Sequence, residues 1–118
     1  MTFAERTYLP QVVSGMMRWL FAYASPEAIG GVWTAAGDVY SLAATIYGAL
    51  CGRPPHWPAD GDAFPPDVYR RMEREPLAQP PHVPVELFAV LRRAMSFEPA
   101  DRQAGMDEFA DDLAKLST

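Results

Sequence analysis

The chain has 118 residues, of which 49% are hydrophobic and 21% charged, the composition of one small globular domain and not of a disordered chain. Ten basic residues stand against 15 acidic ones, which gives a net charge of −5. Because binding to nucleic acid relies on a basic face, this balance excludes nucleic acid as an expected partner.

The sequence also lacks the patterns of secretion and membrane insertion. Its one cysteine, Cys51, cannot form an internal disulfide, which is typical of proteins in the reducing cytosol. The longest uncharged apolar stretch, residues 39–52, is too short to cross a bilayer, and the first 20 residues do not follow the signal-peptide pattern. We therefore expect a soluble, cytoplasmic protein with no membrane contact.

The N-terminal part of the chain predicts an arm and one short helical turn. Residues 1–22 show no clean helical period but carry several bulky apolar side chains, so we expect them to pack against another part of the protein. Ser25 followed by Pro26 predicts a helical turn with Ser25 as its N-cap. Gly30 and Gly31 are expected to end this turn.

The longest predicted element is a helix over about residues 34–51. It carries no charge after Asp38, and Gly52 is a suitable residue to close it. Apolar side chains occupy all of its faces, and a helix that is apolar all round must be buried all round. We expect this helix to be the buried centre of the domain.

Three shorter helices are predicted after it, separated by proline-rich loops. They cover about residues 67–75, the segment that begins at Pro84, and about residues 106–116. The last helix is predicted from apolar residues at helical spacing: Met106, Phe109, Ala110, Leu113 and Leu116. No stretch alternates as a half-buried strand would, so the predicted fold class is all-α.

Several short motifs, taken in order, resemble the second half of a protein kinase catalytic domain. They are Tyr23-Ala24-Ser25-Pro26-Glu27, Asp38-Val39-Tyr40-Ser41-Leu42-Ala43, Gly52-Arg53-Pro54-Pro55, and Arg93-Ala94 with Pro99-Ala100-Asp101-Arg102. They are most similar to bacterial Ser/Thr kinases of the eukaryotic-like type. The resemblance implies that residues 23–118 form the lower half of the large lobe, and that residues 1–22 correspond weakly to part of the activation segment.

The resemblance also implies roles for individual residues. Glu27 and Arg102 would form a buried ion pair that ties the end of the activation segment to the loop before the last helix. Such pairing is expected on physical grounds too, because an unpaired buried charge costs several kcal/mol. Asp38 would accept hydrogen bonds from the catalytic-loop backbone, although the dipole at a helix N-terminus explains an acid there equally well. With Ser25 and Pro26, these residues are structural and not catalytic.

The residues that the kinase reaction needs are missing. Phosphoryl transfer requires a Gly-rich loop, a lysine for the phosphates, an aspartate base, and an Asn and an Asp for Mg²⁺. The chain has no Asn, no Gly-rich loop and no Asp-Phe-Gly, and its single lysine is Lys115. Trp19-Leu20 replaces the Gly-Thr that kinases place before the position of Tyr23. We therefore expect no catalytic, cofactor-binding or metal-binding residues here, although the family uses ATP and Mg²⁺.

Other chemistry is less well supported. Cys51 and His56 could form a nucleophile–base pair, but the position of Cys51 at the end of an apolar helix favours simple packing. The two histidines and one cysteine also lack the spacing of a zinc site.

Two functional interpretations stay open. The chain is either part of a Ser/Thr protein kinase catalytic domain, inactive by itself, or a free-standing degenerate kinase remnant that acts as a protein-interaction or regulatory module. Its expected partner is a protein: the missing kinase half, a second copy, or another protein. We expect a homodimer or a higher oligomer, because the arm over residues 1–22 is short for covering the central helix. Thr7 and Ser14 are candidate phosphorylation sites.

Overall fold

The computed structural model describes residues 22–57 and 65–117, and all regular structure in these residues is helical. The elements are α2 (Pro26–Ile29), α3 (Ala35–Cys51), α4 (Pro65–Arg74), α5 (Val85–Ala94), η1 (Pro99–Asp101), α6 (Met106–Ala114) and η2 (Lys115–Ser117). The predicted all-α class is thus confirmed. No helix in these residues is long and apolar enough to cross a membrane. Thr7, Ser14, Trp19-Leu20 and all but the last residue of the predicted arm lie outside the described residues.

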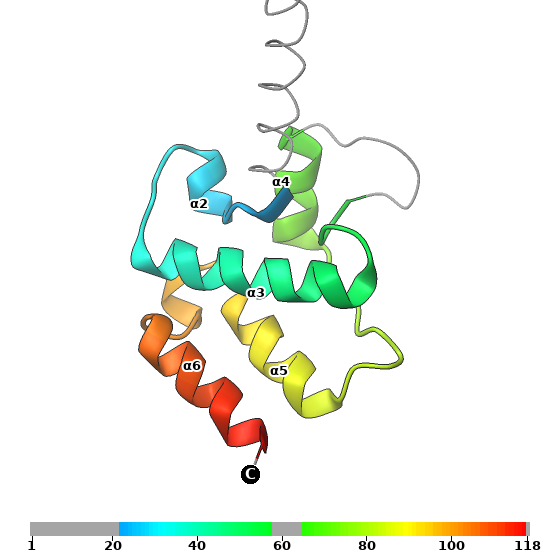
Figure 1. Ribbon diagram of the computed structural model, residues 1–118. Helices are drawn as coiled ribbons and strands as arrows, with labels where there is room; N and C mark the ends of the chain where they lie inside the picture. The colour runs from blue at the N-terminus through cyan, green and yellow to red at the C-terminus, as the bar shows by residue number, and fades with distance from the viewer. Residues whose placement is uncertain (1–21, 58–64, 118) are drawn as a thin grey trace, which may run out of the picture.

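Helix α3 crosses the middle of the molecule (Figure 1). Helices α5 and α6 pack against it and against each other, while α2 lies on its other side and contacts α4. The core is formed by buried side chains of α3, α5 and α6 and the segments beside them: Val39, Tyr40, Ala43, Ala44, Tyr47, Val83, Phe88, Leu91, Ala94, Met95 and Phe109. The prediction that α3 is the central element is therefore correct.

The ends of α2 and α3 follow from local sequence signals. The Thr34 hydroxyl accepts a hydrogen bond from the Gly37 N–H at 3.0 Å and caps the start of α3. Gly52 ends the helix with φ +78°, a left-handed conformation that glycine adopts without a steric penalty. Ser25 caps α2 as predicted, because its Oγ accepts from the Ala28 N–H at 3.2 Å.

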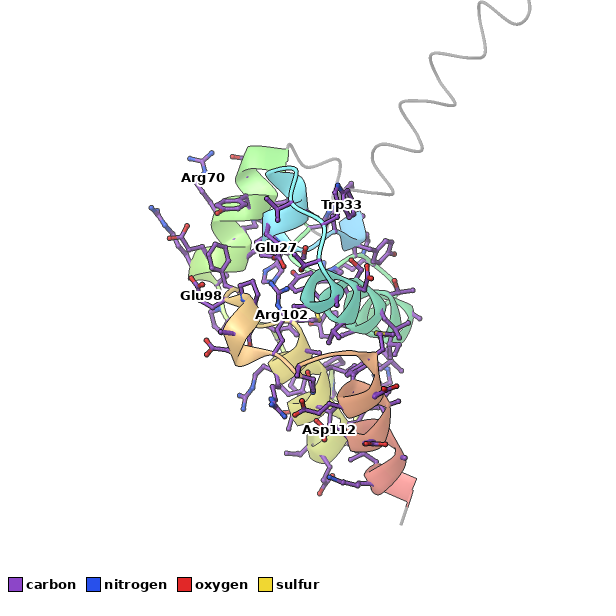
Figure 2. All side chains as sticks on the ribbon, turned by 90° about the vertical axis from the view of Figure 1, so that its left-hand side faces the viewer. Glu27, Trp33, Arg70, Glu98, Arg102 and Asp112 are labelled. Carbon is purple, nitrogen blue, oxygen red and sulfur yellow. The ribbon has the colours of Figure 1, made fainter. Side chains whose placement is uncertain are left out.

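Helix α3 is not buried all round, so that part of the prediction is wrong. Leu42 is 38% exposed. It belongs to a stripe of exposed residues that runs along the helix: Ala35, Asp38, Leu42, Thr45 and Ala49. In Figure 2, which looks nearly along α3, α4 lies to its left and α5 and α6 lie below it. A domain of this size offers too few neighbouring helices to enclose α3 on every side. We call these five residues the α3 stripe.

The apolar residues of the last helix differ in exposure. Phe109 is buried and Leu113 is half-buried, whereas Met106, Ala110 and Leu116 are exposed. Helix α6 lies at the edge of the helical layer (Figure 1), so only a narrow side of it meets α3 and α5. It also ends at Ala114, and the chain continues as η2.

Candidate functional site

Arg102 makes the most enclosed ion pair of the described residues. Its side chain is fully buried, whereas that of its partner Glu27 keeps 16% of its surface exposed. Arg102 Nη1 and Nη2 donate to the two Glu27 carboxylate oxygens at 2.7 and 2.8 Å, and the pair joins residues 75 positions apart. Figure 2 shows the two side chains meeting between α2 and η1. The ion pair predicted from the sequence is therefore present.

The remaining donors of Arg102 bind main-chain oxygens. Its Nε donates to the Ser96 carbonyl at 2.8 Å, and Nη1 and Nη2 donate to the carbonyls of Ala36 and Phe97, both at 3.1 Å. Each of the five N–H groups of the guanidinium thus has an acceptor. The guanidinium also lies 5.0 Å from the centre of the Tyr40 ring. One side chain therefore fastens α2, α3 and the loop before η1 together.

The pair changes the proton affinity of Glu27. Burial alone would raise the pKa of this carboxyl, but hydrogen bonds from Arg102 and from the backbone, with the arginine charge, hold the pKa below its ordinary value of 4.5. The folded protein therefore binds this proton less readily than the unfolded chain does. The stabilisation is fully present above about pH 4.5 and is lost as the pH falls through the lower, folded pKa.

A glycine that the sequence analysis did not single out makes room for this pair. A Cβ atom on Gly37 would lie 3.0 Å from Ser25 Oγ and 3.5 Å from the Glu27 carboxylate. An alanine here would press on the Ser25 hydroxyl that caps α2 and would be in ordinary contact with the Glu27 carboxylate. The signal in the sequence is the glycine itself, because glycine is unfavourable inside a helix unless space requires it.

A second polar network next to Arg102 was also missed. Arg93 of α5 pairs with Glu108 and Asp112 of α6 at 3.0 and 3.4 Å. Gln103, which is fully buried, donates to Asp112 at 3.1 Å, and Glu108 accepts from the Ala104 N–H at 2.8 Å. These contacts hold α5 and α6 side by side. The two Arg93 pairs join residues 15 and 19 positions apart, so no local pattern in the sequence indicates them.

Asp38 is exposed in the first turn of α3, where the helix dipole favours an acid. This position agrees with the simple explanation offered by the sequence. The role that the kinase resemblance gives it, accepting hydrogen bonds from a catalytic loop, stays a prediction.

A cleft of about 820 Å³ lies at the C-terminal end of α3. Cys51 and His56 both line it. Cys51 makes a hydrogen bond with Tyr47, whereas His56 lies near the charges of Glu75 and Arg71. Burial, and to a smaller extent the hydrogen bond with Cys51, raises the pKa of Tyr47 to about 12. Burial lowers the pKa of His56 below its ordinary 6.5. Within residues 22–57 and 65–117, no three His, Cys, Asp or Glu side chains are grouped to hold a metal ion.

Comparison with known proteins places the chain near protein kinases. No family model matches it. It is 29% identical over 106 residues to the serine/threonine-protein kinase PknK of Mycobacterium tuberculosis, and 30% identical over 101 residues to the tyrosine-protein kinase MasK of Myxococcus xanthus. The chain is distantly similar to protein kinases. The alignments take in 87% and 85% of this chain but only 10% and 16% of these relatives.

Proposed function

We propose that this chain is part of a protein kinase catalytic domain, in the lower half of the large lobe, and that it does not transfer phosphate by itself. The observation that carries the proposal is the ion pair between Glu27 and Arg102, which the kinase resemblance pairs and which joins distant segments. The similarity to relatives named as protein kinases supports it. The family reaction is ATP-dependent phosphorylation of protein Ser or Thr, which we favour because the Ser-Pro-Glu motif resembles that of Ser/Thr kinases.

In this proposal the described residues provide support and not chemistry. Arg102 holds α2, which follows the activation segment in the family, against α3 and the loop before η1. ATP and Mg²⁺ would be bound by residues outside this chain. The α3 stripe would be covered by the rest of the lobe, because an apolar side chain such as Leu42 gains stability when it leaves water. We place the kinase to which this chain would belong in the cytoplasm.

A chimeric kinase tests the proposal. The 106 residues of M. tuberculosis PknK that align with this chain would be replaced by their counterparts here, and phosphate transfer from Mg²⁺–ATP to a protein substrate measured. We expect a soluble chimera that is less active than PknK, because Leu20 lacks the hydroxyl of the usual threonine. Adding Arg102→Ala should abolish its activity, whereas Arg70→Ala, at an exposed position, should not.

The isolated chain provides the second part of this test. Millimolar Mg²⁺–ATP should produce no thermal shift and no phosphorylation of Thr7 or Ser14. Phosphate transfer by the isolated chain would contradict the proposal, as would a soluble chimera whose activity does not depend on Arg102.

A free-standing interaction module is the second candidate function. Trp33, in the loop before α3, is 66% exposed, and Val32 beside it is exposed as well. Exposed tryptophan is a frequent anchor of protein–protein interfaces. An inactive chimera, together with cooperative unfolding of the isolated chain, would favour this candidate over the first.

A further inference from the structure

The cleft at the end of α3 has walls of extended, proline-rich chain. Its volume of about 820 Å³ is within the range of ligand-binding clefts. The prolines that line it are Pro54, Pro55, Pro76, Pro80 and Pro81. Because proline has no N–H group, these walls cannot pair with a β-strand through a regular main-chain ladder. A bound chain must therefore be recognised by side chains.

The polar side chains of the cleft are mostly hydrogen-bond donors. Three carbonyl groups beside it are already occupied: Ala78 by the Tyr47 hydroxyl, His56 by Arg71, and Leu50 by the His82 ring. These bonds fix the two walls to the surrounding helices and remove acceptors. Arg53 is exposed at the cleft, and the buried indole N–H of Trp57 has no acceptor within the described part of the chain. Among the described residues that line the cleft, Glu75 is the only acidic one.

Aromatic rings also line the cleft. The rings of Tyr47, Trp57, His56 and His82 stand among the prolines, together with Leu77. Aromatic-lined grooves are the usual docking sites of polyproline II segments, whose rigid backbone loses little entropy on binding. Such a segment also presents carbonyl acceptors and, at its prolines, no donors. Its chemistry therefore complements the donors that the cleft leaves free.

We propose that this cleft binds an extended, proline-rich segment of a partner protein in the polyproline II conformation. The proline rings would pack against Tyr47 and Trp57, and a ligand carbonyl would accept from the Trp57 indole once that ring turns toward the cleft. Arg53 would donate to a second carbonyl at the edge. This binding site does not depend on the proposed kinase function, because none of these residues belongs to the Glu27–Arg102 pair.

Nuclear magnetic resonance of the full chain tests this site. The chain has three tryptophans, so their indole N–H signals are few, and the Trp57 signal is the one that disappears in Trp57→Phe. Titration with a synthetic oligoproline peptide should shift the Trp57 signal in a saturable way and leave that of Trp33 unchanged. A Gly/Ser peptide of equal length should shift neither signal.

Three variants within the site and one control outside it measure the contribution of individual residues. Trp57→Ala should weaken peptide binding about tenfold, the effect of removing an interface aromatic. Trp57→Phe, which keeps an aromatic ring and loses the N–H, should weaken it about threefold, as for one lost hydrogen bond. Trp33→Phe is the matched control at an exposed position and should leave the affinity unchanged. Arg53→Gln, also at an exposed position, provides a further readout if Trp57→Ala does not fold.

Three results would overturn the proposal. The first is a Trp57 signal that does not move at millimolar oligoproline. The second is an equal response to the Gly/Ser peptide, which would show that the cleft does not select proline. The third is a signal that moves with protein concentration alone, which would assign the cleft to a second copy of this chain.

Discussion

Arg102 depends on main-chain oxygens as much as on its charged partner. Three of its hydrogen bonds go to carbonyl groups and two to Glu27. Removing the arginine leaves a partly buried carboxylate and three carbonyls without their donor. Removing only the charge of Glu27 leaves the carbonyl bonds in place. The two partners of one ion pair should therefore differ in what their loss does to stability.

We expect Arg102→Ala to lower the free energy of unfolding by about 3–5 kcal/mol, because it leaves the Glu27 carboxylate and three carbonyl groups without their donor. Glu27→Gln should lower it less, since the three carbonyl groups still accept from Arg102 and the new amide oxygen still accepts from it as well. Urea unfolding at pH 7 measures both. Arg70→Ala is the control: its side chain is 61% exposed, and its effect should be within about 0.5 kcal/mol. Equal losses for the two partners would contradict this account.

His56 should make stability depend on pH. It has a left-handed backbone, with φ +63°, and burial lowers its pKa below 6.5. Because the unfolded chain binds this proton more readily, stability should fall as the pH drops from about 6.5 toward the folded pKa. The His56 ring should titrate below pH 6.5 in the folded protein by nuclear magnetic resonance, and near 6.5 in urea.

His56→Asn is the matching variant for that measurement. Asparagine tolerates the left-handed backbone but does not titrate, so the variant should lose this part of the pH dependence while keeping the fold. A His56 titration above pH 6.5 would contradict the expected direction.

At the scale of the helices, Gly48 of α3 lies against the ring of Tyr23. A Cβ atom at this position would lie 2.9 Å from the ring of Tyr23. Gly48→Ala gains about 1 kcal/mol in helix propensity, but the overpacking costs about 1–3 kcal/mol. We expect net destabilisation in thermal or urea unfolding. Thr45→Ala, on the exposed α3 stripe, is the matched control and should not destabilise. A more stable Gly48→Ala variant would show that Tyr23 moves aside freely.

The elements that the sequence predicts best are those defined by local signals. Thr34 and Gly52 mark the ends of α3 because caps depend on a few neighbouring residues. The exposure of Leu42 and Met106 could not be predicted, since it depends on which helices pack nearby. The kinase resemblance identified Glu27 as the partner of Arg102, because no local pattern connects residues 75 positions apart.

The candidate cleft was beyond sequence analysis for the same reason. The sequence predicts its two walls as proline-rich loops, and both are confirmed as irregular chain where the structure describes them. That these walls face each other depends on long-range contacts, such as the hydrogen bond from Tyr47 to Ala78. The composition therefore predicts that these segments are rich in proline, but it does not predict that they lie next to each other in the fold.

For the whole molecule, the exposed α3 stripe and Trp33 favour association with a second copy. We expect light scattering at micromolar concentration to find a dimer. Leu42→Glu should convert it to a monomer, because a charge would be buried in the contact. Val85→Glu, at an exposed position outside the stripe, should leave the dimer intact. A sharp 13.1 kDa species that binds no hydrophobic dye would contradict this prediction.

The long sequence separation of the Glu27–Arg102 pair has a consequence for folding kinetics. Closing a loop of 75 residues costs more chain entropy than forming the contact between α5 and α6, which follow each other in the chain. The pair should therefore form after the transition state of folding. In stopped-flow experiments, Arg102→Ala should speed unfolding and leave the refolding rate nearly unchanged. Arg102 would then determine how long the folded state lasts and not how quickly it is reached.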